Sequence, residues 1–251
     1  MFAACDIGNS QIKLGLFDKN DLTEFRSFVR PDELFDFIRN IKIENFAVSS
    51  VVPEKMNDIT KKLQSYKLHP FIITKESRFN LTINYDSIDT LGIDRICGCE
   101  GAYYLLKKSP DFKNFTPESS IIVIDFGTAT TLNIIIYPSE FIGGIIAPGI
   151  KMMFDSLHKN TSQLPEVRLN DYKSLAGRDT KSAIASGVIN STTGLIEKTI
   201  SYLKLNMNSE KIRIYITGGN AGNFPEHFDF DFEYEKGLVL YGIKAIFEIN
   251  N

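Results

Sequence analysis

The sequence predicts an α/β fold with two duplicated domains, each a mixed sheet flanked by helices. Two observations carry this prediction. Residues 1–17 and 121–136 each hold two apolar strands that turn at an Asp-x-Gly triplet, and the triplets lie 119 residues apart (125 − 6), nearly half of the 251-residue chain. In addition, strand and helix patterns alternate between residues 31 and 74, which predicts parallel strands joined by crossover helices.

Each hairpin places a carboxylate where an apolar strand ends. Asp6 and Asp125 interrupt apolar runs, and a carboxylate in such a position is costly unless it binds something. Gly8 and Gly127 follow two residues later and allow a ligand to approach the backbone closely. Two such hairpins facing each other across a cleft would offer amide N–H groups and hydroxyls to one polyphosphate, while the carboxylates hold its counter-cations. This arrangement resembles that of the actin, Hsp70 and sugar-kinase superfamily.

The first half alternates between strand and helix patterns. Proline opens two of its helices, and acidic residues fill the first turn after Pro31. A third helix begins near Asp94 and ends in two lysines before Pro110. The predicted elements are strands at 45–52 and 70–74, an extended segment at 81–85, and helices at 31–41, 53–66 and 94–108.

The second half restarts at residue 121 after a polar segment with two prolines. We therefore predict a boundary within residues 109–119, with an N-terminal domain at 1–117 and a C-terminal domain at 118–251. The later elements are strands at 141–149 and 211–217, helices at 150–158, 180–205 and 236–248, and an irregular loop at 160–176.

The bulk composition is that of a globular protein with a proper core. The net charge is −3, and no block rich in Lys and Arg predicts contact with nucleic acid or an anionic membrane. No apolar run is long enough to span a bilayer, and the N-terminus lacks a signal-peptide pattern. Three cysteines without metal-ligand spacing indicate reduced thiols. We expect a cytoplasmic protein that binds neither nucleic acid nor a membrane.

Asp94 and Arg95 are the candidate reacting and binding residues of the first half. An Asp at the start of a helix is commonly only a cap, and that interpretation stays open. Gly92 permits a tight approach, and a helix N-terminus favours the charged carboxylate that a general base needs. Arg95 offers a planar fork for a substrate carboxylate or a transferring phosphoryl group.

Other positions have two interpretations each. Gly218 and Gly219 follow a predicted strand and form either a simple turn or a place where an adenine ring lies against the backbone. Tyr85 is a core aromatic or a substrate hydrogen-bond donor, Thr180 is a helix cap by default, and Lys13 points to solvent or to the nucleotide region. The chain has no G-x-x-x-x-G-K-[ST] and no G-x-S-x-G, which excludes an ordinary P-loop and a hydrolase nucleophile elbow.

Seven motifs, in order along the chain, resemble those of the type III pantothenate kinase family and cover essentially its whole length. They are Asp6–Phe17, Gly92–Arg95 with Gly101–Tyr103, Asp125–Thr131, Gly143–Gly149, Thr161–Pro165, Gly177–Thr180 with Ala183–Gly187, and Thr217–Gly219. Seven ordered motifs are far more specific than any single glycine pattern.

The resemblance implies two domains like those of actin and ribonuclease H, with the active site in the cleft between them. It implies phosphorylation of the primary hydroxyl of pantothenate by ATP to 4′-phosphopantothenate, the first step of coenzyme A biosynthesis. Asp94 would be the general base of this reaction.

The same resemblance implies the binding residues. Pantothenate would contact Tyr85, Gly92, Ile93, Asp94, Arg95 and Thr180, the last across the interface of a homodimer. ATP would contact Asp6, Ile7, Gly8, Asn9, Ser10, Gln11, Ile12, Lys13, Thr128, Gly218 and Gly219. Mg²⁺ is expected on the phosphates near Asp6, and Asp125 would hold a monovalent cation, K⁺ or NH₄⁺.

The chain departs from the family pattern at three places. Ser10 stands where Thr is usual, Asn133 where a second Asp is common, and Glu100–Gly101 where a pair of small residues is usual. Asn133 removes any negative charge that this position would lend to the cation site. Two other functions stay open: a superfamily kinase or phosphatase acting on another small hydroxylated substrate, and a non-enzymatic accessory factor for transcription.

Overall fold

The structure, a computed structural model, describes residues 1–221 and 228–251, which fall into two compact units. Unit 1 consists of Met1–Asn114, Ser139–Gly143 and Gly237–Asn251, and unit 2 consists of Phe115–Pro138 and Gly144–Lys236. The C-terminal helix, α6 (Leu238–Asn250), therefore belongs to unit 1, whereas the sequence analysis assigned it to the second domain.

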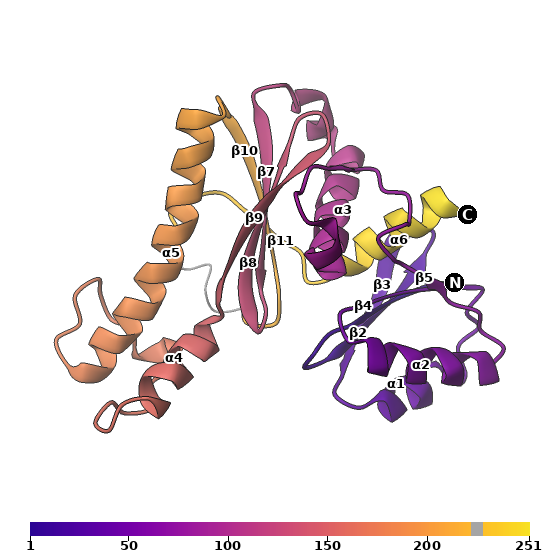
Figure 1. The fold of residues 1–251 in the computed structure, drawn as a ribbon, viewed down its shortest axis with the longest axis horizontal. Helices are drawn as coiled ribbons and strands as arrows, with labels where there is room; N and C mark the ends of the chain where they lie inside the picture. The colour runs from indigo at the N-terminus through magenta and orange to yellow at the C-terminus, as the bar shows by residue number, and fades with distance from the viewer. Residues whose placement is uncertain (222–227) are drawn as a thin grey trace. The chain divides into compact units, whose positions relative to one another are not determined.

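Unit 1 is built on a mixed sheet with the strand order β3-β2-β1-β4-β5 (Figure 1). The strands are β1 (Phe2–Ile7), β2 (Ile12–Asp18), β3 (Asp21–Phe28), β4 (Asn45–Ser50) and β5 (Phe71–Ile72). Hairpins make β1, β2 and β3 antiparallel, while β1, β4 and β5 are parallel. The parallel strands need crossover connections, and these contain α1 (Pro31–Ile38) and α2 (Pro53–Ser65).

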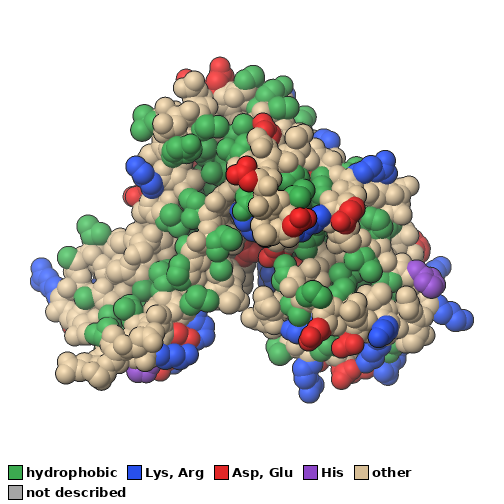
Figure 2. Space-filling view, in the orientation of Figure 1, with side chains coloured by type: hydrophobic (Ala, Val, Ile, Leu, Met, Phe, Trp, Pro, Cys, Tyr) green, Lys and Arg blue, Asp and Glu red, His purple; other side chains and the backbone are tan. Residues whose placement is uncertain are grey.

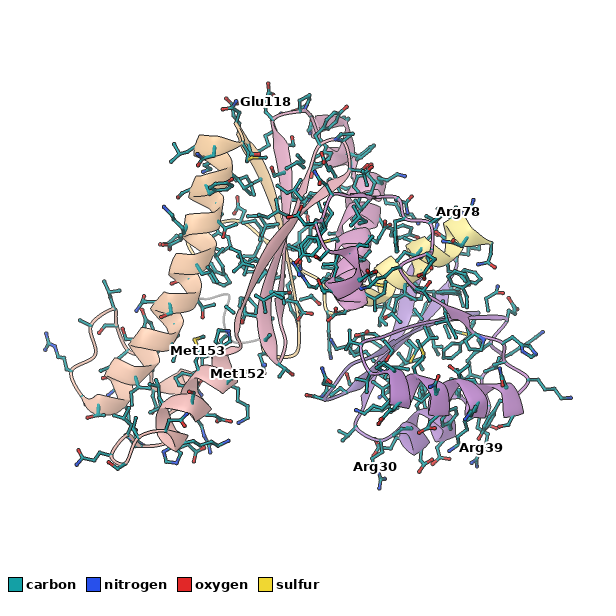
Figure 3. All side chains as sticks on the ribbon, in the orientation of Figure 1. Arg30, Arg39, Arg78, Glu118, Met152 and Met153 are labelled. Carbon is teal, nitrogen blue, oxygen red and sulfur yellow. The ribbon has the colours of Figure 1, made fainter. Side chains whose placement is uncertain are left out.

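The two crossover helices begin at prolines, as the sequence predicts. Pro31 and Pro53 occupy the first helical position, where a missing N–H leaves no hydrogen bond unmade. In α1 the Glu33 carboxylate accepts the backbone N–H of Arg30 at 3.2 Å, which completes the N-terminus. Figure 3 shows Arg30 and Arg39, the two flanking residues of α1, directed outward from the helix.

The two other helices of unit 1 are in direct backbone contact with each other. Helices α3 (Ile93–Lys108) and α6 approach closely because both carry a glycine at the contact. A Cβ atom on Gly101 would overlap the carbonyl oxygen of Leu238, and one on Gly242 would overlap the carbonyl oxygen of Cys97. Helix α6 also contacts β1, β2 and β4. These contacts explain why the last helix of the chain is part of unit 1.

The two faces of the unit 1 sheet are covered by different helices. Cys5 and Ile7 of β1 belong to a buried apolar cluster with residues of α1 and α2. Because side chains alternate along a strand, Phe2 and Asp6 point to the opposite face. There the Phe2 ring centre lies 4.9 Å from that of Phe247 in α6. Asp6 is thus directed to the face that carries α6.

Unit 2 contains the second hairpin in a mixed sheet. Its strands are β7 (Ser119–Phe126), β8 (Ala129–Ile136), β9 (Glu140–Pro148), β10 (Lys211–Thr217) and β11 (Glu233–Tyr234). The first residues of β9 belong to unit 1, and there they pair with β6 (Thr82–Ile83). The strand order is β11-β10-β7-β8-β9-β6. Strands β7 and β8 are antiparallel, while β7, β10 and β11 are parallel. Helix α4 (Ile150–Lys159) packs against α5 (Thr180–Asn206) and β8.

The predicted fold class is confirmed, because the described residues form two mixed sheets flanked by helices. Each predicted helix is present, with ends that differ by at most three residues. The sequence analysis missed β3 and the two-residue strand β11. Strand β3 lies at a sheet edge, and none of its residues is fully buried, so its sequence lacks the apolar pattern of the inner strands.

Charged side chains of both signs are interspersed on the face of the molecule shown in Figure 2. Several of them pair within one helix: Arg39 lies 3.0 Å from Asp36 in α1, and Lys151 lies 2.9 Å from Asp155 in α4. Exposed pairs of this kind contribute at most about 1 kcal/mol to stability. Within the ranges 1–221 and 228–251, no helix is long and apolar enough to cross a membrane.

We predict that Gly101→Ala destabilises the protein, because the added methyl group has to separate two helix backbones. The expected loss is about 1–3 kcal/mol of unfolding free energy, as in overpacked cores. Gly194→Ala in α5 is the matched control, since nothing lies within 4 Å of its new Cβ atom. Because alanine has a better helix propensity than glycine, the free energy of unfolding of this variant should stay unchanged or rise by up to about 1 kcal/mol. Urea unfolding followed by circular dichroism measures both, and equal stabilities would contradict the close approach at Gly101.

Candidate functional site

The first hairpin joins β1 to β2 through an exposed loop. Asp6 of β1 pairs with Lys13 of β2, and the backbone N–H of Gly8 donates to the carbonyl oxygen of Gln11 at 3.0 Å. Residues 9–10 at the tip are exposed. The ATP contacts predicted between Asp6 and Lys13 therefore all belong to one hairpin of unit 1.

Asp6 is buried and is held by the neighbouring strand. Its side chain is 7% exposed, and the hydroxyl of Ser49 in β4 donates a hydrogen bond of 3.0 Å to its Oδ1 atom. The parallel register places Ser49 directly beside Asp6. Ser49 also forms a side-chain hydrogen bond with Cys97 of α3. A chain of contacts thus leads from the first hairpin to helix α3.

The Cys97 thiol lies among several carboxylates. Burial raises its pKa well above the usual value, and the negative charges of Asp6, Asp94 and Glu100 raise it further, whereas the Ser49 hydrogen bond lowers it. Cys97 is therefore a neutral thiol in the folded protein. Both predicted carboxylates of unit 1, Asp6 and Asp94, thus contribute to the negative potential at this thiol.

Asp94 lies in the first turn of α3 and is half-buried. Its Oδ1 atom accepts the backbone N–H of Arg95 at 2.9 Å. Gly92 is the N-cap residue, and a Cβ atom there would overlap this same oxygen, so glycine leaves room for the carboxylate. Ile93 packs into the core. The bond from the Arg95 amide is of the kind that a capping carboxylate accepts. The helix N-terminus also favours a negative charge at this position, which suits a base.

Arg95 is buried beside two aromatic rings of unit 1. Its guanidinium carbon lies 5.9 Å from the ring centres of both Tyr85 and Phe141, at cation–π distance. The two rings are 6.0 Å apart. Gly143 has a φ of +115°, and its Cβ position lies 3.8 Å from the Tyr85 ring, so the backbone passes close beside that ring. Tyr85 and Arg95, both predicted to bind substrate, therefore lie together.

The second hairpin, in unit 2, is closed like the first by the amide of its glycine. Asp125 of β7 pairs with Thr131 of β8, and the backbone N–H of Gly127 donates to the carbonyl oxygen of Ala129 at 3.1 Å. Thr128 at the tip is exposed. The hydroxyl and backbone of Thr128 are therefore accessible to a ligand.

Two further glycine segments of unit 2 approach this turn. Gly218 has a φ of +101°, and a Cβ atom there would lie 2.5 Å from Oδ1 of Asp125. A Cβ atom on Gly149 would overlap the carbonyl oxygen of Thr128, whereas no atom of the described residues lies within 4 Å of the Cβ position of Gly219. The structure thus brings Gly218 and Gly219 to the second hairpin, with open space at Gly219.

The donor atoms at the hairpins suit a cation shared with phosphate groups. Hard cations prefer carboxylate and carbonyl oxygens, and each hairpin supplies a carboxylate, Asp6 or Asp125. Among the residues that the structure describes, no group of three or more His, Cys, Asp or Glu side chains could hold a metal ion. A cation at Asp6 or Asp125 would therefore need further oxygen ligands, such as those of a nucleotide. Asn133 donates its amide to the Thr131 hydroxyl at 3.3 Å and adds no carboxylate.

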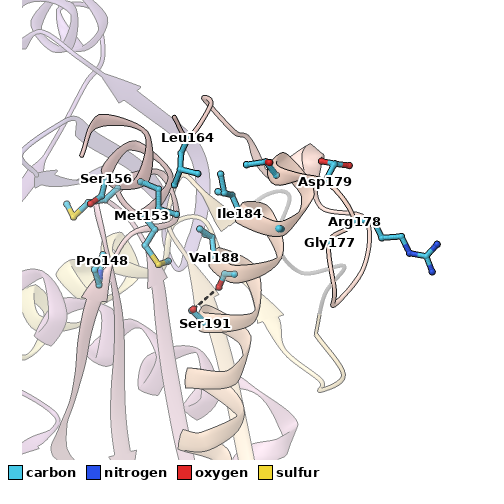
Figure 4. A pocket seen from close by; sticks show the side chains of 15 residues that line it. Pro148, Met153, Ser156, Leu164, Gly177, Arg178, Asp179, Ile184, Val188 and Ser191 are labelled. Atoms are coloured by element: carbon cyan, nitrogen blue, oxygen red, sulfur yellow. Dashed lines mark hydrogen bonds between the residues drawn. The ribbon is translucent and has the colours of Figure 1, made fainter. Parts of the chain in front are cut away.

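Thr180 belongs to unit 2, whereas the other predicted substrate residues belong to unit 1. It lines a cavity of about 1070 Å³ between α4 and α5. Apolar side chains dominate the lining, among them Met153, Ile184 and Val188, whereas Arg178 points away from the cavity (Figure 4). Figure 3 shows Met153 on α4. The cavity belongs to unit 2 alone.

The default interpretation of Thr180 as a helix cap is wrong by one residue. The N-cap of α5 is Asp179, whose Oδ1 atom accepts the backbone N–H of Ser182 at 2.9 Å. This backbone N–H and the ammonium group of Lys173 lower the pKa of Asp179 to about 2. A carboxylate accepts this bond better than a hydroxyl because it is charged. Thr180 is thereby left as the first residue of the helix.

Three residues around the unit 1 motifs were missed by the sequence analysis. Lys55 of α2 donates from Nζ to the carbonyl oxygen of Asn9 at 2.8 Å, which places a positive charge at the tip of the first hairpin. Ser49 holds Asp6, and Phe141 lies beside Arg95. The Ser-Ser pair that ends β4 was a signal for Ser49, whereas Lys55 and Phe141 reach the site through contacts that are distant in sequence.

Comparisons with known proteins give the family of the chain. The sequence model of the family described as type III pantothenate kinase matches residues 2–202. A type III pantothenate kinase of Legionella pneumophila (strain Corby) is 32% identical, and the match covers 100% of this chain and 99% of that protein. Another, from Sulfurihydrogenibium sp. (strain YO3AOP1), is 29% identical, with coverages of 97% and 98%.

Solved structures of distant sequence share the fold. A putative 2-dehydro-3-deoxygalactonokinase from Sinorhizobium meliloti has a TM-score of 0.57 at 12% identity and covers 99% of both chains. A putative N-acetylmannosamine kinase from Listeria monocytogenes has a TM-score of 0.53 at 11% identity and covers 100% of this chain and 99% of its own. Sequence identities this low show the fold alone. The family match and the full-length relatives go further, and the chain is a kinase that belongs to the type III pantothenate kinase family.

Proposed function

We propose that this protein phosphorylates the primary hydroxyl of pantothenate with ATP, giving 4′-phosphopantothenate and ADP, the first step of coenzyme A biosynthesis. The observation that carries the proposal is the half-buried Asp94 carboxylate in the first turn of α3, for which Gly92 leaves room and which Arg95 follows in sequence. A phosphate-binding hairpin and a carboxylate at a helix N-terminus are the parts that transfer of a phosphoryl group to an alcohol requires. The family of the chain supplies the substrate.

The nucleotide is proposed to be bound by both hairpins. The loop between Asp6 and Lys13 and the turn at Thr128 would donate backbone and side-chain hydrogen bonds to the phosphates, with Gly218 and Gly219 against the adenosine. Lys55, which donates to the carbonyl oxygen of Asn9 at the tip of the first hairpin, would offset the charge of the phosphates. Mg²⁺ would be held by Asp6 together with phosphate oxygens, and K⁺ or NH₄⁺ by Asp125. These cations would supply charge neutralisation.

Asp94 would act as the general base. The alcohol oxygen attacks the γ-phosphorus, the bond from that phosphorus to the ADP oxygen breaks, and the Asp94 carboxylate accepts the alcohol proton. Support comes from the first turn of α3, where the half-buried carboxylate lies at the positive end of the helix and Gly92 leaves space for it.

The carboxylate of pantothenate is proposed to bind Arg95. The buried guanidinium lies beside both Tyr85 and Phe141, and its planar shape suits bidentate recognition of a carboxylate. Tyr85, Gly92 and Ile93 would complete the wall in unit 1. Thr180 would come from a second copy of the chain in a homodimer, as the resemblance to the family implies. The setting of this reaction is proposed to be the cytoplasm.

The test is an assay of ADP release with pantothenate and with a panel of sugars and short hydroxy acids, each with and without K⁺. We expect turnover with pantothenate that depends on K⁺, and a phosphorylated product that mass spectrometry identifies. Turnover with another member of the panel and none with pantothenate would instead identify a different superfamily kinase.

For Asp94→Asn we predict a fall in kcat of about 10²–10⁴-fold, the usual contribution of a general base. The KM values for ATP and pantothenate should change little, because the amide occupies the same space. Asp89→Asn is the control, since Asp89 is an exposed residue in the preceding segment. Retention of full turnover by Asp94→Asn would remove this residue as the base.

For Arg95→Lys we predict a rise in the KM for pantothenate of about 10–100-fold with little change in the KM for ATP. Lysine keeps the charge but lacks the planar fork that binds a carboxylate through two hydrogen bonds. Steady-state kinetics with each substrate varied in turn measures both constants. An equal rise in both would place Arg95 at the phosphates rather than at the pantothenate carboxylate.

A further inference from the structure

Helix α3 carries a carboxylate in the interior of unit 1 to which the proposed reaction assigns no task. Glu100 is 0% exposed, which makes it the most deeply buried charged side chain among the described residues. The rest of this part of the helix is apolar or small, including Cys97 and Cys99. Burying a carboxylate costs stability unless hydrogen bonds compensate for the lost water.

Both oxygens of Glu100 accept hydrogen bonds from one segment of the chain. Nδ2 of Asn80 donates to Oε2 at 2.8 Å, and the backbone N–H of Leu81 donates to Oε1 at 2.9 Å. Leu81 is itself buried, so this amide has no access to water if the carboxylate is removed. Glu100 thus ties α3 to the residues immediately before β6.

The same segment leads to Tyr85, and the same helix carries Arg95. Four residues beyond Leu81, the Tyr85 ring lies 5.9 Å from the guanidinium carbon of Arg95. The segment is fixed on its other side by β9, where the backbone N–H of Asn84 donates to the carbonyl oxygen of Phe141 at 2.9 Å. Helix and segment therefore meet at two places, once through Glu100 and once where Tyr85 and Arg95 lie together.

We propose that Glu100 is a positioning residue for pantothenate binding, which holds the segment from Asn80 to Tyr85 against α3 so that Tyr85 and Arg95 present one preformed surface to the substrate. This inference rests on the proposed function of Tyr85 and Arg95. An apolar side chain could fill the space but could not bind the Leu81 amide or the Asn80 side chain.

Burial of the Glu100 carboxylate lowers the stability of the folded protein. Burial raises the pKa of Glu100 above its usual value, although the Asn80 and Leu81 hydrogen bonds and the charge of Lys107 lower it. The folded chain therefore binds this proton more tightly than the unfolded chain does, and the contribution of Glu100 to stability falls as the pH rises above the ordinary pKa of a glutamic acid, 4.5. A residue that only filled the core would not need an ionisable group here.

The test compares Glu100→Met with Glu100→Gln in the full-length protein. Met keeps the length of the side chain and loses both acceptors, whereas Gln can accept from Leu81 and donate to the Asn80 amide oxygen after that amide turns over. We expect Glu100→Met to raise the KM for pantothenate about 10-fold or more, the effect of a lost buried hydrogen bond. The KM for ATP should stay within about twofold, and Glu100→Gln should restore the KM for pantothenate.

Hydrogen–deuterium exchange supplies a readout that does not depend on activity. Peptides covering residues 80–85 should exchange faster in Glu100→Met than in the wild type, and at the wild-type rate in Glu100→Gln. Faster exchange with an unchanged KM for pantothenate would overturn the proposal, because Glu100 would then be a structural tether only. A parallel rise in both KM values would also overturn it, since positioning of the pantothenate surface predicts an effect on one substrate.

If Glu100→Met does not fold, Asn80→Ala makes the same comparison from the other end of the hydrogen bond. This variant keeps the Leu81 bond, so we expect a smaller rise in the KM for pantothenate, about threefold, with the KM for ATP unchanged. No rise would overturn the proposal. The wild-type assay separates this inference from the proposed function: absence of pantothenate turnover in the wild type rejects the function, whereas normal wild-type turnover with an unaffected variant rejects only the role of Glu100.

Thermal unfolding as a function of pH checks the cost that we assign to Glu100. The Gln variant cannot ionise, so its Tm should exceed that of the wild type at pH 8, and the difference should shrink as the pH falls toward 4.5. This sign follows because the wild-type acid is neutral in both the folded and unfolded states at low pH. A Gln variant that is less stable at pH 8 would contradict the argument that a carboxylate is kept here at a cost.

Discussion

Direct backbone contact between α3 and α6 is the constraint on which the arrangement of unit 1 depends. Glycines at 101 and 242 let the two helices approach until each meets the other's carbonyl groups. Helix α3, which carries Asp94, Arg95 and Glu100, is therefore held in place by its backbone contact with α6. The side chains proposed to bind ligands are not needed for that contact. Rigid secondary structure positions polar groups more accurately than loops do. The charged residues of α3 are consequently oriented by packing that lies outside the site.

The parts of the molecule that the sequence predicts well are those whose signals are local. The two hairpins are marked by apolar strands around a carboxylate and a glycine, and the helices by prolines at their starts and apolar residues on one face. Strand β3 was not predicted, because an edge strand does not need buried residues and so lacks the apolar pattern of an inner strand. The cap of α5 was misassigned by one position, since Asp179 and Thr180 are both acceptable cap residues and only the backbone geometry distinguishes them.

The environment of the candidate site could be predicted only in part, because its contacts join residues far apart in the chain. Ser49 reaches Asp6 through the parallel register of β1 and β4, and Lys55 reaches the first hairpin from α2. Phe141 arrives beside Arg95 only because the start of β9 pairs with β6. Glu100 accepts hydrogen bonds from Asn80 and Leu81, 20 and 19 residues earlier in the chain, and no local pattern indicates this pairing.

The membership of the last helix in unit 1 has a consequence for how the protein is made. A ribosome releases the chain from its N-terminus, so the strands with the first hairpin emerge long before α6 does. Until α6 arrives, the glycine-lined surface of α3 and one face of β1 lack their covering and expose apolar side chains. The nascent polypeptide therefore completes the unit that holds Asp94 only after unit 2 has been translated in full.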